Sequence, residues 1–161
     1  MPPLFSIVMP VLNAGEFVER ALRSVLAQVG DDTEVIVVDG GSTDGSVEVI
    51  EALLRPLSGR NDECKNGRGI GTGCVRDIRL GDARGVSGDE PARPSEGAKR
   101  AGRFYWSSEP DGGQSAALNK GFARARGRYL LWINADDLLL PGTLDRAREH
   151  LRKHPECSWL A

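Results

Sequence analysis

The first fifty-odd residues alternate between short apolar runs and segments with helical spacing. The apolar runs at 5–9 and 34–39 predict buried strands, and the β-branched residues of the second run are typical of a central parallel strand. Apolar residues recur on one face of 17–26, which predicts an amphipathic helix, and the capping-box spacing before it makes Asn13 the expected N-cap. A further helix is predicted over 47–55, so this part of the chain has the order β-α-β-α.

The same alternation returns after residue 103. A third strand is predicted over 104–107, and a helix over 113–127 with Gly127 as its C-terminal stop. A fourth strand, 129–134, precedes a last helix over 143–153. Strands that alternate with helices in this way predict an α/β fold, with helices on both faces of a mostly parallel sheet in three layers.

The segment 58–103 differs from the rest of the chain, because it holds half of the 20 glycines and almost no clusters of aliphatic residues. Such a composition buries too little apolar surface to offset the ordering of the chain. We therefore expect one domain, 1–161, that contains a long flexible or disordered insertion. The glycines at 67–73 do not form a dinucleotide fingerprint, since no predicted strand precedes them and no helix follows.

Charge and cysteine content narrow the class of protein. The net charge of −2 gives no electrostatic basis for a nucleic-acid partner. The three cysteines contain no CxxC pair, which favours reduced thiols and a cytoplasmic protein. No apolar run approaches the roughly 20 residues that span a bilayer, so we expect no transmembrane segment, while peripheral membrane association stays open.

Acidic residues follow three of the predicted strands, at Asp39, at Asp111 and at the pair Asp136–Asp137. The carboxyl ends of parallel strands meet at one edge of a sheet, where ligands of α/β proteins bind. Each carboxylate alone could serve only as the N-cap of the following helix. For Asp44 and Asp137 this structural explanation and a functional one both stay open. Several carboxylates at one edge are better explained by a divalent cation, and oxygen ligands without His or Cys favour Mg²⁺ or Mn²⁺. Because such a cation commonly completes its shell with phosphate oxygens, a nucleotide diphosphate is the expected ligand.

The aromatic and histidine side chains give weaker evidence about function. Trp106 and Trp132 both fall within predicted strands, so we expect them to fill the core rather than to stack on a sugar. His150 and His154 have a spacing that could bind zinc, but beside Arg and Lys near a helix C-terminus they are better explained by the helix dipole.

Four motifs follow one another along the chain: "FSIVMPVLNAGEFVERALRSVLAQ", "EVIVVDGGSTDGS", "SEPDGGQSAALNKGFARARGRYLLWINADD" and "LPGTL". Taken together, they resemble the N-terminal, donor-binding half of a family 2 glycosyltransferase of the GT-A fold. The resemblance covers the chain except 58–103. It implies transfer of a sugar from a nucleotide-diphospho-sugar, with UDP-sugars favoured, to an acceptor hydroxyl, and Mn²⁺ or Mg²⁺ as cofactor.

The resemblance assigns the nucleoside contacts to the first two strands. Pro10, Val11 and Asn13 match the turn that lines the base pocket. Asp39 matches the acid that accepts a hydrogen bond from the base, usually uracil.

The later motifs are implied to bind the remainder of the nucleotide. Asp111, Asn119 and Lys120 match the stretch that closes over it. Asn134 and Asp136 match the first and last positions of the DxD motif, of which the first contacts the ribose and the last binds the metal. Many relatives have Asp at the first position, so the loss of one charge at Asn134 implies weaker metal affinity.

The family supplies its catalytic base from the half of the domain that follows the DxD motif, so we expect the base beyond Ala161. The acceptor, whether a glycan, a lipid or a protein, is not identified by the sequence. The alternative function is therefore a non-catalytic fragment that binds a nucleotide sugar. A nicotinamide oxidoreductase is excluded, because the first strand is not followed by the glycine fingerprint.

Overall fold

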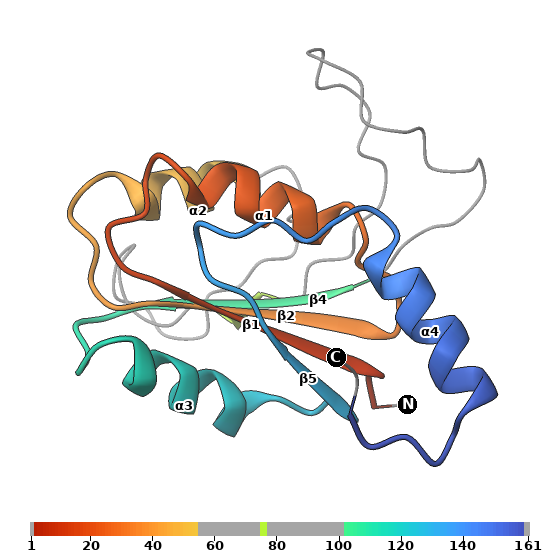
Figure 1. The fold of residues 1–161 in the computed structure, drawn as a ribbon. Coiled ribbons are helices and arrows are strands. Elements are labelled where there is room, and N and C mark those ends of the chain that lie inside the picture. The colour runs from red at the N-terminus through yellow and green to blue at the C-terminus, as the bar shows by residue number, and fades with distance from the viewer. Residues whose placement is uncertain (1, 55–74, 77–101, 160–161) are drawn as a thin grey trace.

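The computed structural model describes residues 2–54, 75–76 and 102–159, which form a sheet covered by helices on both faces (Figure 1). None of the helices in the described part of the chain is both long and apolar enough to cross a membrane. The elements in chain order are β1 (Phe5–Val11), α1 (Val18–Leu26), β2 (Thr33–Asp39), α2 (Ser46–Leu54), β3 (Val75–Arg76), β4 (Arg103–Ser108), α3 (Gln114–Arg124), β5 (Tyr129–Trp132) and α4 (Thr143–Lys153).

The strand order of the sheet is β3-β4-β2-β1-β5. β1 pairs in parallel with both β2 and β5, and β2 pairs in parallel with β4. Only β3 runs antiparallel, to β4. The predicted α/β fold with a mostly parallel sheet is thus confirmed, and the loops that follow β1, β2, β4 and β5 lie at the same edge of the sheet.

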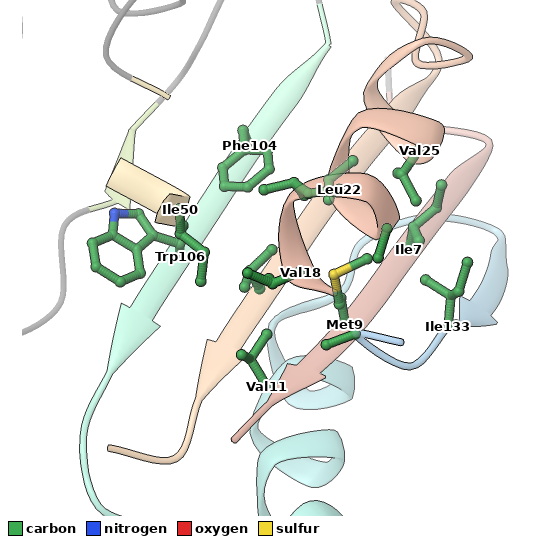
Figure 2. Close-up of a cluster of buried hydrophobic side chains, with 14 of the residues drawn as sticks. Ile7, Met9, Val11, Val18, Leu22, Val25, Ile50, Phe104, Trp106 and Ile133 are labelled. Carbon is green, nitrogen blue, oxygen red and sulfur yellow. The ribbon is translucent and has the colours of Figure 1, made fainter. Parts of the chain in front are cut away.

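The main core lies between the sheet and the pair α1 and α2 (Figure 2). Every residue of β1 and β2 is buried, which explains why their sequences are mostly apolar and do not alternate. α3 covers the opposite face of the sheet (Figure 1). A smaller cluster lies there, and its buried members are Val8, Ile36, Val38 and Ala117.

α3 approaches β1 closely because Gly121 has no side chain. A Cβ atom added at Gly121 would lie 2.3 Å from Cγ1 of Val8, which is fully buried. Glycine in a helix is normally unfavourable, so its use here indicates that the helix-to-sheet distance requires it.

Two predicted helix boundaries are wrong. α1 begins at Val18 without a side-chain cap, whereas the Asn13 side chain accepts a hydrogen bond from the Thr43 N–H in the loop after β2. α3 ends at Arg124, three residues before Gly127. A Cβ atom at Gly127 would lie 2.5 Å from the Ser6 backbone nitrogen, so this glycine permits contact with β1 rather than ending the helix.

The two tryptophans of the strands differ. Trp106 is buried in the main core, as predicted, whereas Trp132 is 50% exposed and the prediction of a core position is wrong. The reason is topological: β5 is the edge strand of the described sheet, and α3 packs over β1 and β2.

Two residues of the predicted insertion 58–103, Val75–Arg76, form the short strand β3 beside β4. Apart from these and 102–103, the insertion lies outside the described residues.

Arg148 attaches α4 to the other end of the sheet. Its guanidinium donates to both oxygens of Asp32, each at 2.8 Å, and lies 5.7 Å from the centre of the Phe5 ring. A second carboxylate, Asp145, accepts from the same guanidinium. The hydrogen bonds from Arg148 hold the pKa of Asp32 below its ordinary value.

The Gly121→Ala substitution should destabilise the fold. Alanine in a helix normally gains about 0.5–1 kcal/mol over glycine, but overpacking against Val8 costs about 1–3 kcal/mol. We expect Gly121→Ala to lower the free energy of unfolding measured in urea. The same substitution should cost less in a chain that already carries Val8→Ala, because the smaller side chain makes room for the added methyl group. A higher free energy of unfolding for Gly121→Ala would contradict the close packing of α3 on β1.

The Arg148→Gln substitution should change how stability depends on pH. Because the pKa of Asp32 is lower in the folded state, its contribution is complete above the unfolded value of about 3.8 and is lost as pH falls through the lower folded value. The difference in free energy of unfolding between wild type and Arg148→Gln should therefore shrink as pH falls from about 5 to about 2. Arg146→Gln, on the same helix but with only 3.5 Å contacts, is the matched control. A difference that stays constant over this range would contradict the assignment.

Candidate functional site

A cavity of about 420 Å³ opens at the carboxyl edge of the parallel strands. Three segments line it. The first is 10–14 with Phe17, from the end of β1 and its loop, and the last is 134–136 after β5. The second lies around the start of α3 and contributes Asp111, Gly113, Gln114 and Ala117. This is the edge at which parallel α/β sheets bind their ligands.

The loop after β1 is held by the loop after β2. Asn13 has a positive φ of 49°, a left-handed conformation that Asn tolerates better than most residues. Its backbone N–H donates to Ser42 Oγ at 2.8 Å, and its Oδ1 accepts from the Thr43 N–H at 3.0 Å. The cavity wall at Asn13 is therefore fixed by contacts between residues thirty positions apart.

A second set of bonds continues this connection. The Gly15 N–H donates to Asp44 Oδ2 at 2.8 Å, and the Ala14 N–H donates to Ser46 Oγ at 2.9 Å. Hydrogen bonds from Ser46, and then from the Gly15 backbone, lower the pKa of Asp44. Asp44 thus stabilises the junction of the two loops as an ionised carboxylate.

Asp39 lies beneath these loops and is fully buried. Its Oδ2 accepts from the Gly41 and Ser42 N–H groups, both at 3.0 Å, and from Ser108 Oγ at 2.7 Å. Its Oδ1 accepts from the Ser42 hydroxyl. Four donors, three from the loop after β2 and one from Ser108 at the end of β4, thus satisfy this carboxylate, and Asp39 does not line the cavity.

Asp111, by contrast, lines the cavity, and one of its carboxylate oxygens has no hydrogen-bond partner among the described residues. Its Oδ1 accepts from the Gly113 N–H at 2.7 Å. Its Oδ2 is buried and has no hydrogen-bond partner among the described residues. The carboxylate fits against Gly40, where an added Cβ would lie 3.0 Å from Oδ1.

The segment after β5 keeps the alternation of a strand although the strand has ended. Ile133 and Ala135 are buried in the main core. Between and after them, Asn134 and Asp136 reach the cavity. Buried neighbours thereby fix the positions of two polar side chains at the rim.

The Asn134 side chain makes three hydrogen bonds. Its Oδ1 accepts from Gln114 Nε2 at 2.8 Å and from the indole N–H of Trp132 at 3.0 Å. Its Nδ2 donates to Asp137 Oδ2 at 3.0 Å. Asp137 therefore bonds within its own loop and caps no helix, since α4 begins only at Thr143.

The cavity brings together six of the nine residues expected from the sequence: Pro10, Val11, Asn13, Asp111, Asn134 and Asp136. Three others do not line it. Asp39 lies below the loops, Asn119 is exposed on α3, and Lys120 forms an ion pair with Glu109 at 2.9 Å.

Phe17, Gln114 and the Trp132–Asn134 contact were not anticipated from the sequence. Gln114 is the first residue of α3 and follows two glycines, and this position at a helix start beside an acidic residue is the only local signal for it.

The acidic side chains at the cavity rim fit a divalent cation only in part. Asp136 and Asp137 are exposed, and their oxygens are of the type that Mg²⁺ and Mn²⁺ prefer. Among the residues that the structure describes, no three His, Cys, Asp or Glu side chains gather in an arrangement that could hold a metal ion. A cation at this rim would therefore need ligand atoms from a bound molecule.

Comparison with known proteins identifies the family and the fold of the chain. The family model described as glycosyl transferase family 2 matches residues 6–77 and 96–160. An uncharacterized glycosyltransferase, EpsJ, from Bacillus subtilis (strain 168) is 25% identical over 154 residues, which cover 96% of this chain and 32% of that protein.

Solved structures share the fold. S. aureus TarS 1-349 in complex with UDP-GlcNAc has a TM-score of 0.56 at 20% identity, over 94% of this chain and 32% of that one. The mannosyltransferase PcManGT from Pyrobaculum calidifontis in complex with GDP-Man and Mn²⁺ has a TM-score of 0.56 at 21% identity, over 94% and 33%. These likenesses confirm the predicted GT-A type of α/β fold, and the chain spans about a third of the length of these proteins. Because the family model covers most of its residues, the chain belongs to glycosyl transferase family 2.

Proposed function

We propose that this chain binds the nucleotide-diphospho-sugar donor of a glycosyl transfer reaction, in which a sugar passes to an acceptor hydroxyl. The observation that carries the proposal is the cavity, which unites the loop after β1 with Asp111, Asn134 and Asp136 at the carboxyl edge of the sheet. A UDP-sugar is the favoured donor. The TarS structure, which is a complex with UDP-GlcNAc, supports this choice.

The loop after β1 is suited to the nucleoside. Pro10, Val11 and Phe17 provide an apolar wall against which a flat base can pack, and hydrogen bonds to the loop after β2 hold that wall in place. Asp39 could meet a base only by exchanging the hydrogen bonds of Ser42 or Ser108. Asp111 is the other carboxylate proposed to serve the nucleotide, since one of its oxygens is unsatisfied by the described residues.

Asp136 is the proposed metal ligand, with Mn²⁺ or Mg²⁺ as the cofactor. The PcManGT structure, a complex with GDP-Man and Mn²⁺, supports the use of a divalent cation. A cation held by one or two carboxylates takes its other ligands from phosphate oxygens, in keeping with the small donor set at this rim. When bound, it would neutralise the charge that develops on the diphosphate leaving group.

The residues of this chain then bind and orient the donor. Asn134 and Asp136 approach the cavity from one side and the start of α3 from the other, so a diphosphate would lie between them. Asp136 is not proposed as the base that deprotonates the acceptor hydroxyl, because a carboxylate committed to a cation is a poor proton acceptor.

Donor binding should appear as thermal stabilisation. UDP with Mn²⁺, at about a hundred times the dissociation constant, should add about 2.7 kcal/mol to the free energy of unfolding and raise the melting temperature by several degrees. UDP alone and Mn²⁺ alone should each add much less, because the diphosphate is held through the cation. No shift with UDP, GDP or CDP plus Mn²⁺, in a sample with a cooperative unfolding transition, would contradict the proposal.

Alanine at the two acidic positions should separate binding from architecture. Asp136 is exposed, so Asp136→Ala should leave the melting temperature of the free protein unchanged and remove the Mn²⁺-dependent part of the stabilisation by UDP. Asp39→Ala should lower the melting temperature of the free protein, because loss of the buried acceptor leaves several donors unsatisfied at about 1–3 kcal/mol each. Equal effects of both substitutions on the free protein would refute this division of roles.

A further inference from the structure

Trp132 is an exposed tryptophan whose indole N–H makes a hydrogen bond at the edge of the site. Half of its surface is accessible, so the core does not hold the ring. Its Nε1–H donates to Asn134 Oδ1 at 3.0 Å, two residues further along the chain. Since an indole N–H can only donate, this bond needs an acceptor at position 134.

The bond from Trp132 is one of three that determine the orientation of the Asn134 amide. Gln114 Nε2 donates to the same Oδ1 at 2.8 Å, so both lone pairs of the carbonyl oxygen are engaged. On the other side, Nδ2 donates to Asp137 Oδ2 at 3.0 Å. A flipped amide would place its NH₂ group against two donors and its oxygen against a carboxylate, so only the observed orientation satisfies all partners.

This arrangement changes what Asn134 can do for a ligand. With its carbonyl oxygen engaged by Gln114 and Trp132, Asn134 cannot also accept a hydrogen bond from a ribose hydroxyl unless one of these donors leaves. Its Nδ2 group donates one of its two N–H bonds to Asp137, the carboxylate next to Asp136 in the chain.

We propose that Trp132 and Gln114 are positioning residues: they fix the Asn134 amide so that its N–H group holds the Asp137 carboxylate in a set position beside Asp136. The acidic segment is then arranged before a metal–diphosphate group binds, and less ordering is required on binding. This inference rests on the proposed function, because it assigns the arrangement to nucleotide binding.

The pair formed by Asn134 and Asp137 also accounts for Asn in place of the usual first Asp of the motif. A carboxylate at 134 could accept from Trp132 and Gln114 equally well. It would, however, place a second negative oxygen about 3 Å from Asp137, where the amide now donates. In the free protein these like charges would repel each other.

The Trp132→Phe substitution removes only the donor and keeps an aromatic ring. The dissociation constant for UDP in the presence of saturating Mn²⁺, measured by calorimetry, should rise about two- to tenfold, the equivalent of one hydrogen bond. The melting temperature of the free protein should not change, since the ring is half exposed. Trp159→Phe is the matched control: this tryptophan is 74% exposed, does not line the cavity, and should leave the affinity unchanged.

A charge exchange tests the second half of the proposal without any ligand. Asn134→Asp should lower the melting temperature of the free protein, and addition of Asp137→Asn should restore it, because the pair again has one carboxylate and one amide. If Trp132→Phe binds UDP with Mn²⁺ as tightly as wild type, or if Asp137→Asn does not rescue Asn134→Asp, the positioning role is overturned while donor binding stands. If wild type itself binds no nucleotide diphosphate with Mn²⁺, both the proposed function and this inference fail.

Discussion

The arrangement of the site depends on the hydrogen bonds that the buried Asp39 carboxylate accepts. It accepts hydrogen bonds from the loop after β2 and from Ser108 at the end of β4. Ser42, which donates to this carboxylate, also accepts from the backbone of Asn13 in the loop after β1. One fully buried side chain therefore connects three neighbouring strand ends. A buried carboxylate is costly unless its oxygens are paired, so these loops and Asp39 stabilise one another.

The site combines rigid support with exposed polar groups. Support comes from buried residues: Asp39 and Ile133, which do not line the cavity, and Ala135, which is buried in the core beside it. Asn134 and Asp136 are placed at the rim of the cavity by the buried Ile133 and Ala135. Such a division allows exposed side chains to be held in position without burying them, as preorganised binding requires.

The sequence predicts the sheet well because the relevant signal is local. The runs 5–9 and 34–39 are mostly apolar and do not alternate with polar residues, a pattern typical of strands buried on both faces. The position of Asp136 at the ligand-binding edge follows from the same reasoning. Local patterns also suffice for α4, whose bounds of Thr143–Lys153 agree with the prediction.

The errors arise where a residue responds to a distant part of the chain. Asn13 fits a capping box but bonds Thr43, and Gly127 resembles a helix stop but packs on Ser6. Trp132 was expected in the core because the sequence does not show that its strand lies at the edge of the described sheet. One of the hydrogen bonds to Asp39 comes from Ser108, 69 positions away, and no local sequence pattern predicts that contact.

A crystal structure of the chain soaked with UDP and MnCl₂, with anomalous data at the manganese edge, would locate both components at once. We expect a manganese peak at the Asp136 carboxylate, bridged to the diphosphate, with the base against Pro10 and Val11. A nucleotide bound away from this cavity would show that the carboxyl edge of the sheet is not the donor site. A manganese peak at His150 and His154 in place of Asp136 would likewise contradict the assignment of the metal ligand.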